Sequence, residues 1–193
     1  MANFSPVYIN STTAEKYTTN AQNEILEHKA RLRLLSHLEE QVKAWGNKVV
    51  NKRFIDPLAA RIAEDMNDGN RWHTFGISLK EGVAKYQPCW TFVLHVRVNG
   101  GYETTELYNP YENSGEVPYI GSDRRINPDA LAKAIASKQE YLLSRIKDLE
   151  DAITNVGKVE QTYKELGQYV AKVMETLPKE FRSPLFHGSP IEG

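Results

Sequence analysis

Three side chains that could bind a metal ion or assist catalysis lie close together in the sequence: His73, Cys89 and His95. Protein zinc sites usually show CxxC, HxxxH or HExxH spacings, and none of these occurs here. By strand alternation His95 falls on the face opposite the apolar residues, whereas His73 shares the parity of Phe75 and Ile77. The two histidines are therefore expected to face opposite ways. The sequence predicts structural histidines and no metal site.

Nucleophilic catalysis needs a serine or cysteine beside a base that is oriented by an acid. Nothing in the order of residues or in a local motif picks out such a triad, and no glycine-rich nucleotide-binding loop occurs. Cys89 precedes Trp90 at a strand start, which favours a small packing residue. We therefore expect no catalytic residue and no cofactor, and the protein is predicted not to be an enzyme.

Two arginines, Arg124 and Arg125, just precede a helix start at Asn127 and Pro128. Free backbone N–H groups at a helix start and two guanidinium groups can together hold a phosphate or another acidic group. The plainer reading is a solvated linker with salt bridges to nearby acids. With the tyrosines of the adjoining stretch, they form a predicted protein-binding surface that consists of Tyr108, Tyr111, Tyr119, Arg124 and Arg125.

A second candidate surface is basic and would bind nucleic acid. It consists of Lys48, Lys52 and Arg53 with Tyr102, and Lys29, Arg31 and Arg33 precede it in the same predicted helix. Lysine and arginine neutralise phosphates, and tyrosines offer faces on which unpaired bases stack. The formal net charge of −1 argues against strong nonspecific binding to nucleic acid.

The elements that must position these residues centre on the stretch 71–108, which alone has the pattern of strands. Cys89–Val98 places five apolar residues on one face: Trp90, Phe92, Leu94, Val96 and Val98. Arg71–Lys80 is predicted as an earlier strand, and Glu81–Pro88 as a connector. Asn99–Gly101 predicts a hairpin turn, followed by a return strand over Tyr102–Tyr108 whose inward face is ambiguous. The residues 109–127 are expected to form a long irregular loop.

A long helix is predicted from Thr13 to about Val50, with Gly46 and Asn47 as possible end signals. Its apolar residues recur at coiled-coil spacing, which fits either an intramolecular core or an intermolecular coiled coil. A second helix is expected to begin at Asp56 and Pro57, with Leu58, Ile62 and Met66 on one face.

From Pro128 to Leu177 an apolar seven-residue period runs without a change of phase. Its members are Ile135, Leu142, Leu149, Val156, Tyr163, Val170 and Leu177. A companion row is interrupted by Lys138 and Arg145 and resumes at Ala152, Val159, Leu166 and Val173. Both a single helix and a helical hairpin broken near Gly157 fit this pattern. A single helix would demand a partner helix along its length.

The composition, with 40% hydrophobic and 25% charged residues, is typical of a water-soluble domain. The single cysteine excludes an internal disulfide, no apolar run reaches membrane-spanning length, and no secretory signal is evident. Cytoplasmic localisation, in a cell or an infected host, is expected. We predict an N-terminal arm (1–12), one α+β domain with a helical stalk (13–177) and a C-terminal arm (178–193).

The predicted fold class is α+β, with a three-stranded antiparallel sheet between a long N-terminal helix and a long C-terminal helix or helical hairpin. The leading hypothesis is a non-catalytic protein-interaction module that self-associates through its helices as a homodimer or higher oligomer. It would suit a small accessory, inhibitory or assembly protein of the kind that phages and mobile elements encode. The alternative is a nucleic-acid-binding accessory protein.

Overall fold

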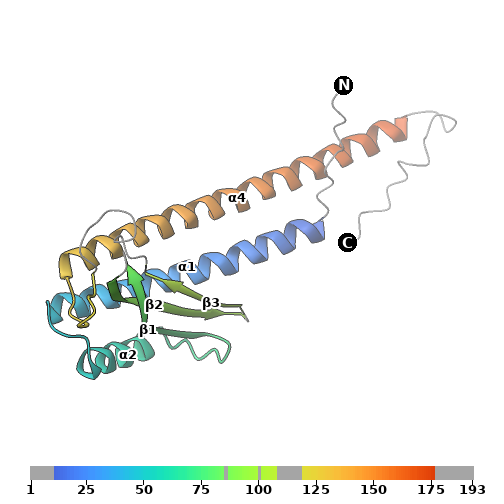
Figure 1. Cartoon of the computed structure of the whole chain (residues 1–193). Coiled ribbons are helices and arrows are strands. Elements are labelled where there is room, and N and C mark those ends of the chain that lie inside the picture. Colours follow the sequence, from blue (N-terminus) through green and yellow to red (C-terminus); the bar gives the residue numbers. More distant parts are fainter. Residues whose placement is uncertain (1–10, 85–86, 100, 108–118, 177–193) are drawn as a thin grey trace. The chain divides into compact units, whose positions relative to one another are not determined.

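A computed structural model describes residues 11–84, 87–99, 101–107 and 119–176. In these residues the elements follow one another as α1 (Ser11–Trp45), α2 (Lys52–Met66), β1 (Thr74–Ala84), β2 (Gln87–Val98), β3 (Gly101–Glu106) and α4 (Pro128–Thr176), as Figure 1 shows. The α+β fold class is confirmed, with a long helix near each end of the described chain. The predicted arms lie outside the described residues, except that Ser11 and Thr12 belong to α1.

The chain forms two compact units, which we describe separately. The sheet unit is Asn23–Lys147, and the helical unit consists of the chain before Asn23 together with the chain after Lys147. Both long helices contribute to both units, because α1 passes Asn23 and α4 passes Lys147.

The three strands pair antiparallel in the order β1-β2-β3, and their register confirms the predicted apolar face. Phe75 lies opposite Val96, Ile77 opposite Leu94, and Leu79 opposite Phe92. Phe92, Leu94 and Val96 are fully buried, so the apolar side of β2 forms the base of the core. In Figure 1, α2 lies beside β1.

The predicted connector Glu81–Pro88 is wrong, because most of it belongs to strands. β1 continues to Ala84 and β2 begins at Gln87, with Gly82 opposite Cys89 and Ala84 opposite Gln87. Glu81 and Gly82 have low intrinsic preference for strands and therefore suggested a loop. In the fold, their backbone groups pair with the long partner strand, and pairing outweighs local propensity.

The register of β3 against β2 determines which residues of β3 share the apolar face of the sheet, which the sequence left ambiguous. Val98 pairs with Gly101 across the predicted turn, where Asn99 has a positive φ of 48°. Glu103 lies opposite Val96 and therefore takes an inward position in the register, whereas Glu106 lies opposite Val93 on the outer face. The side chain of Glu103 is nevertheless 68% exposed, so this register position does not bury its carboxylate.

The core of the sheet unit collects apolar residues from α1, α2, β2 and the first turns of α4. Within the described part of the chain its fully buried members include Leu34, Leu35, Leu38, Phe54, Phe92, Leu94, Val96, Leu107, Tyr119, Ile120, Leu131, Ile135 and Leu142. The stripe of α1 in this unit therefore packs against the chain's own sheet and helices. Of the two readings that the sequence left open for α1, the intramolecular core holds here.

The second helix begins five residues earlier than predicted. Asn51, not Asp56, is the N-cap residue, and its side-chain oxygen accepts a hydrogen bond from the backbone N–H of Arg53 at 2.9 Å. Pro57 therefore lies inside α2. The earlier start brings Phe54 into line with Leu58, Ile62 and Met66, and all four side chains are buried.

The part of the predicted loop that the structure describes is folded tightly. Tyr119–Asn127 makes a short hairpin in which Ile120 bridges Ile126 and the N–H of Asn127 donates to the carbonyl of Tyr119 at 2.7 Å. Its turn spans Gly121–Arg124, and Arg124 has a φ of 59°. The N–H of Trp90 donates to the carbonyl of Ile120, so the hairpin is attached to β2.

The C-terminal element is one helix of 49 residues that continues through Gly157, as the orange part of Figure 1 shows. Of the two readings left open, the single helix holds. In the described part of the helical unit the buried hydrophobic residues are only Ala14, Ala21 and Leu149. This unit therefore has a thin core of its own.

Candidate functional site

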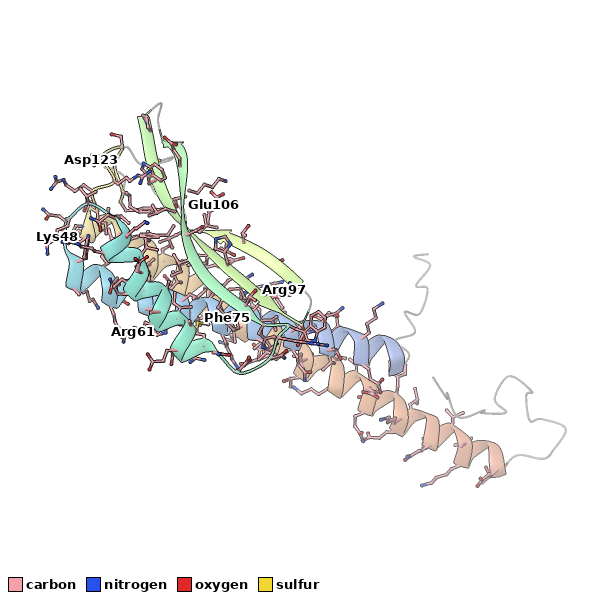
Figure 2. The ribbon with its side chains drawn as sticks, turned by 90° about the horizontal axis from the view of Figure 1, so that it is seen from below. Lys48, Arg61, Phe75, Arg97, Glu106 and Asp123 are labelled. Atoms are coloured by element: carbon pink, nitrogen blue, oxygen red, sulfur yellow. The ribbon has the colours of Figure 1, made fainter. Side chains whose placement is uncertain are left out.

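A short antiparallel bridge joins two segments that lie far apart in the sequence, 48–50 and 124–126. Val49 pairs with Arg125. The backbone N–H of Val50 donates to the carbonyl of Arg124 at 2.9 Å, and the backbone N–H of Ile126 donates to the carbonyl of Lys48 at 3.3 Å. Val50 and Ile126 are buried beneath the bridge. Figure 2 shows Lys48 and Asp123 at the same end of the sheet unit.

This bridge merges two surfaces that the sequence analysis treated as alternatives. We call the merged surface the basic patch: Lys48, Lys52, Arg53, Arg124 and Arg125, with the indole rings of Trp45 and Trp90. All five cationic residues are exposed, and both tryptophans are half-buried. The bridge is non-local, so no sequence motif would have revealed the patch.

Few acids neutralise the basic patch. Arg125 pairs with Asp123, its Nε lying 3.4 Å from Oδ2. The other four cations form no ion pair with the described part of the chain. By contrast, Arg33, Lys43 and Arg61 on neighbouring helices are each paired with a carboxylate.

Two of the cations lie over indole rings. The guanidinium carbon of Arg124 is 4.0 Å from the ring centroid of Trp90, and the ammonium of Lys48 is 5.5 Å from that of Trp45. Trp45 is itself held by an edge contact with Phe54 at 5.6 Å and by a hydrogen bond from its Nε1 to the carbonyl of Val49. The aromatic residues are therefore fixed parts of the fold.

Of the remaining predicted binding residues, only Tyr119 has a described side chain, and it is not part of the basic patch. Tyr119 is fully buried, and its hydroxyl donates to the carbonyl of Leu107 and contacts Thr91, so its side chain belongs to the core. Tyr108 and Tyr111 lie outside the described residues, as does the side chain of Tyr102.

The upstream basic residues do not extend the patch as one stripe. The side chain of Arg33 donates to both the backbone carbonyl and the carboxylate of Asp65, each at 2.8 Å, at the end of α2. The side chain of Arg31 is buried at 1% exposure and points into the fold. Helical spacing thus distributes these residues over different faces of α1.

The buried side chain of Arg31 is the centre of a charged cluster that joins α1 to β3. Its Nη2 donates to Glu103 at 2.9 Å and to Glu27 at 3.4 Å, and its Nη1 donates to Nδ1 of His28 at 3.1 Å. Burial raises the pKa of Glu27 and lowers the pKa of His28, and the charge of Arg31 adds to the second effect. Burial, with Arg31 nearby, likewise lowers the pKa of Lys138. The buried guanidinium of Arg31 thus pairs with the exposed carboxylate of Glu103 on β3.

The histidines occupy separate places, as predicted. His73 precedes β1, where its Nδ1 donates to Asp68 at 2.6 Å and its Nε2 lies 3.1 Å from Asn99. His95 lies on β2 within 2.6 Å of the hydroxyl of Ser78. Among the described residues no group of three or more His, Cys, Asp or Glu side chains is placed to hold a metal ion.

The Ser78–His95 pair has the atoms of a nucleophile and a base, but its setting is that of a cross-strand contact. Ser78 lies opposite Val93 and His95 opposite Gly76, on the outer face of the sheet. The nearby Glu106 carboxylate forms an ion pair with Lys80. A hydrogen bond between neighbouring strands is an ordinary way to stabilise a sheet.

A second feature is a row of apolar side chains along the C-terminal part of α4. We call it the open seam: Val156, Val159, Tyr163, Leu166, Val170 and Val173. Leu166 is 54% exposed and Tyr163 49% exposed, and Val159 and Val173 are each 39% exposed. Their seven-residue period is evident from the sequence, whereas their exposure is known only from the structure.

Comparison of the chain with protein-family models, with curated proteins and with solved structures found no match. Within the described part of the chain, no helix combines the length and apolar character that crossing a membrane requires. Function must therefore be argued from the basic patch and the open seam.

Proposed function

We propose that this protein is a non-catalytic interaction module that self-associates by packing the open seam of α4 against the same seam of a second copy. The observation that carries the proposal is a regular heptad row on a continuous helix, in which four members are exposed and two are half-buried: Val159, Tyr163, Leu166 and Val173 are exposed, and Val156 and Val170 are half-buried. Exposed large apolar residues in a contiguous row are typical of interaction surfaces.

The positions of the seam are those of a two-stranded coiled coil. Val156, Tyr163 and Val170 occupy one seam position (a), and Val159, Leu166 and Val173 occupy the other (d). β-Branched residues at position a with leucine at d favour two strands in parallel dimers. Val156, Val170 and Leu166 match this preference, whereas Tyr163 at a and the valines at d depart from it. What supports packing against a second helix is the unbroken apolar character of the row.

The residues that flank the seam support a second copy as the occupant. Positions e and g of a heptad contact the partner helix, and here they are almost uncharged: Ile153, Asn155, Thr162, Gly167, Tyr169 and Thr176, with Glu160 as the exception. Two identical helices thus meet with little like-charge repulsion. The charged residues lie on the opposite side, as Lys158, Lys164, Glu165, Lys172 and Glu175.

The thin core of the helical unit is a further support. An exposed helical segment receives little stability from propensity alone, and most helical stability in proteins comes from packing an apolar face. Burying a large apolar side chain contributes about 2 kcal/mol, so several seam residues together offset the ordering of this segment. A second copy supplies the missing surface.

The experiment compares the molar masses of three full-length proteins by light scattering after size exclusion. For a chain of 22.0 kDa, the wild type is expected at twice that mass. Leu166→Glu places a charge at the centre of the seam and is expected to give the monomer mass. Lys164→Glu introduces a glutamate at a position that faces away from the seam, and it is the matched control that should stay dimeric.

Folding of the variants is checked independently of the seam. All three tryptophans, Trp45, Trp72 and Trp90, lie in the sheet unit. Their near-ultraviolet circular dichroism should be the same in all three proteins. A wild type that is monomeric, or a Leu166→Glu variant that keeps the wild-type mass, would rule out the seam as the self-association surface.

A further inference from the structure

We infer that the basic patch is a binding site for single-stranded nucleic acid, with its cations on the phosphates and its stacked Arg124 and Trp90 on a base. This inference is independent of self-association, because every residue of the patch belongs to the sheet unit.

The first support is the concentration of unpaired positive charge. Of five exposed cations, only Arg125 has a carboxylate partner within the described chain. The molecule as a whole carries a net charge of −1, so this is a local positive field on a nearly neutral protein. A local row of lysines and arginines is the footprint that a phosphate backbone requires.

The second support is the charge arrangement at the start of α2. The positive end of a helix macrodipole favours acidic residues, yet the first turn of α2 contains none and begins with Lys52 and Arg53. Two cations at this end repel the dipole and stabilise the free fold poorly. An anion that binds across Lys48, Lys52 and Arg53 would offset that repulsion.

The third support is aromatic. Proteins that bind single strands combine a basic surface with flat groups on which bases stack, and an arginine plane over an aromatic ring is such a group. The guanidinium carbon of Arg124 lies 4.0 Å from the ring centroid of Trp90, and Arg124 is an exposed residue. A surface that recognised acidic protein segments by charge alone would have no need of this arrangement.

The fourth support is the backbone of Arg124. Its φ of 59° lies in the left-handed region, which costs a residue with a side chain about 1 kcal/mol. Two backbone hydrogen bonds hold this conformation. The N–H of Arg124 donates to the carbonyl of Gly121, and the carbonyl of Arg124 accepts a hydrogen bond from the N–H of Val50. Strained backbone that is held in this way is characteristic of functional positions.

The test is fluorescence anisotropy of the full-length protein with labelled single strands of about 20 nucleotides, oligo-dT and oligo-U, and a duplex of the same length. Titrations at about 50 mM and about 200 mM salt give the dependence of affinity on salt. Both single strands are expected to bind, more tightly than the duplex. The ratio of the affinities for oligo-dT and oligo-U then indicates whether the site prefers DNA or RNA.

The decisive variant is Lys48→Ala/Arg124→Asn/Arg125→Ala. Asparagine tolerates positive φ, so Arg124→Asn removes the guanidinium while keeping the turn. For single strands each phosphate contact contributes about 0.7 to the salt slope, so the loss of the Lys48 and Arg125 contacts should lower that slope by about 1.4, while the loss of Arg124 removes the stacking surface. Affinity at the lower salt concentration should fall by at least about tenfold.

The matched control is Lys43→Ala/Arg61→Ala/Lys80→Ala, which removes the same number of positive charges from exposed, ion-paired positions. It should bind as the wild type does. Three results would overturn the inference: no binding of either strand by the wild type, equal losses in the two triple variants, or a duplex or poly-glutamate chain that binds as tightly as the single strands.

Discussion

The buried guanidinium of Arg31 shows how a single residue ties elements together at the residue scale. The side chain of Arg31 is buried, and its hydrogen-bond partners come from α1 itself and from β3. Its Nη1 donates to Nδ1 of His28, which requires that nitrogen to be unprotonated and fits a neutral imidazole with a lowered pKa. A buried charge of this kind is stable only while its partners remain.

Replacing Arg31 by methionine should destabilise the protein by about 3 kcal/mol, because the largely buried carboxylate of Glu27 then loses its cation. Adding Glu27→Gln should recover about half of that loss, because the unpaired charge is gone. Urea unfolding followed by tryptophan fluorescence measures both changes. If Arg31→Met alone is as stable as the wild type, the charged cluster does not contribute to the free energy of unfolding.

The His73–Asp68 pair predicts a dependence of stability on pH. The carboxylate of Asp68 raises the pKa of His73 above 6.5, so its contribution is complete below that value and is lost as pH rises through the folded pKa. Hydrogen bonds, first from the backbone of Asn70 and then from His73, lower the pKa of Asp68 below 3.8, so its contribution is lost as pH falls through that lower pKa. The pair therefore contributes fully between 3.8 and 6.5.

Asp68→Asn keeps the hydrogen bond to the backbone of Asn70 but removes the charge that stabilises protonated His73. Between about pH 6 and about pH 8.5 the wild type should lose more thermal stability than the variant does. Melting temperatures of both proteins at the two pH values measure the difference. Parallel pH profiles would show that the pair contributes nothing to folding.

At the scale of elements, local signals predicted which elements exist better than where they end. The apolar alternation of β2 and the spacing of four in α2 were sufficient, because both faces meet one core. The C-terminal end of β1 and the start of α2, by contrast, depend on tertiary contacts with other parts of the chain. Pairing with β2 extends β1 to Ala84, and burial of Phe54 favours the cap at Asn51 over the Asp56–Pro57 signal.

The cap at Asn51 carries a direct prediction. Asn51→Ala should destabilise the protein by about 1 kcal/mol, because the N–H of Arg53 loses its side-chain acceptor. Asn51→Asp is the control, since aspartate accepts the same bond, and it should stay close to the wild type. Urea midpoints decide between them. If both variants unfold at the same denaturant concentration, the cap has no energetic role.

At the scale of the whole molecule, the candidate surfaces differ in how far the sequence could reach them. The seam is a local period and was visible as soon as α4 was read as one helix. The basic patch depends on the bridge between Val49 and Arg125, a contact between distant segments that no local pattern encodes. Tyr119 illustrates the same limit, because a loop tyrosine gives no sign that its hydroxyl lies beside Thr91 in the core.

The two units also divide the proposed roles. The sheet unit has a dense core and contains the basic patch, whereas the helical unit exposes the open seam. Substitutions in the seam should therefore change molar mass while the tryptophan signal of the sheet unit persists. Substitutions in the basic patch should change binding of single strands while molar mass persists.

Self-association through the open seam can be tested by amide hydrogen exchange of residues 157–176, measured at high and low protein concentration. If a second copy covers the open seam, these amides exchange slowly at high concentration and faster on dilution, whereas amides of β2 exchange alike at both. The same exchange rate for residues 157–176 at both concentrations, whether fast or slow, would contradict the account, because protection of α4 would then not depend on a second copy.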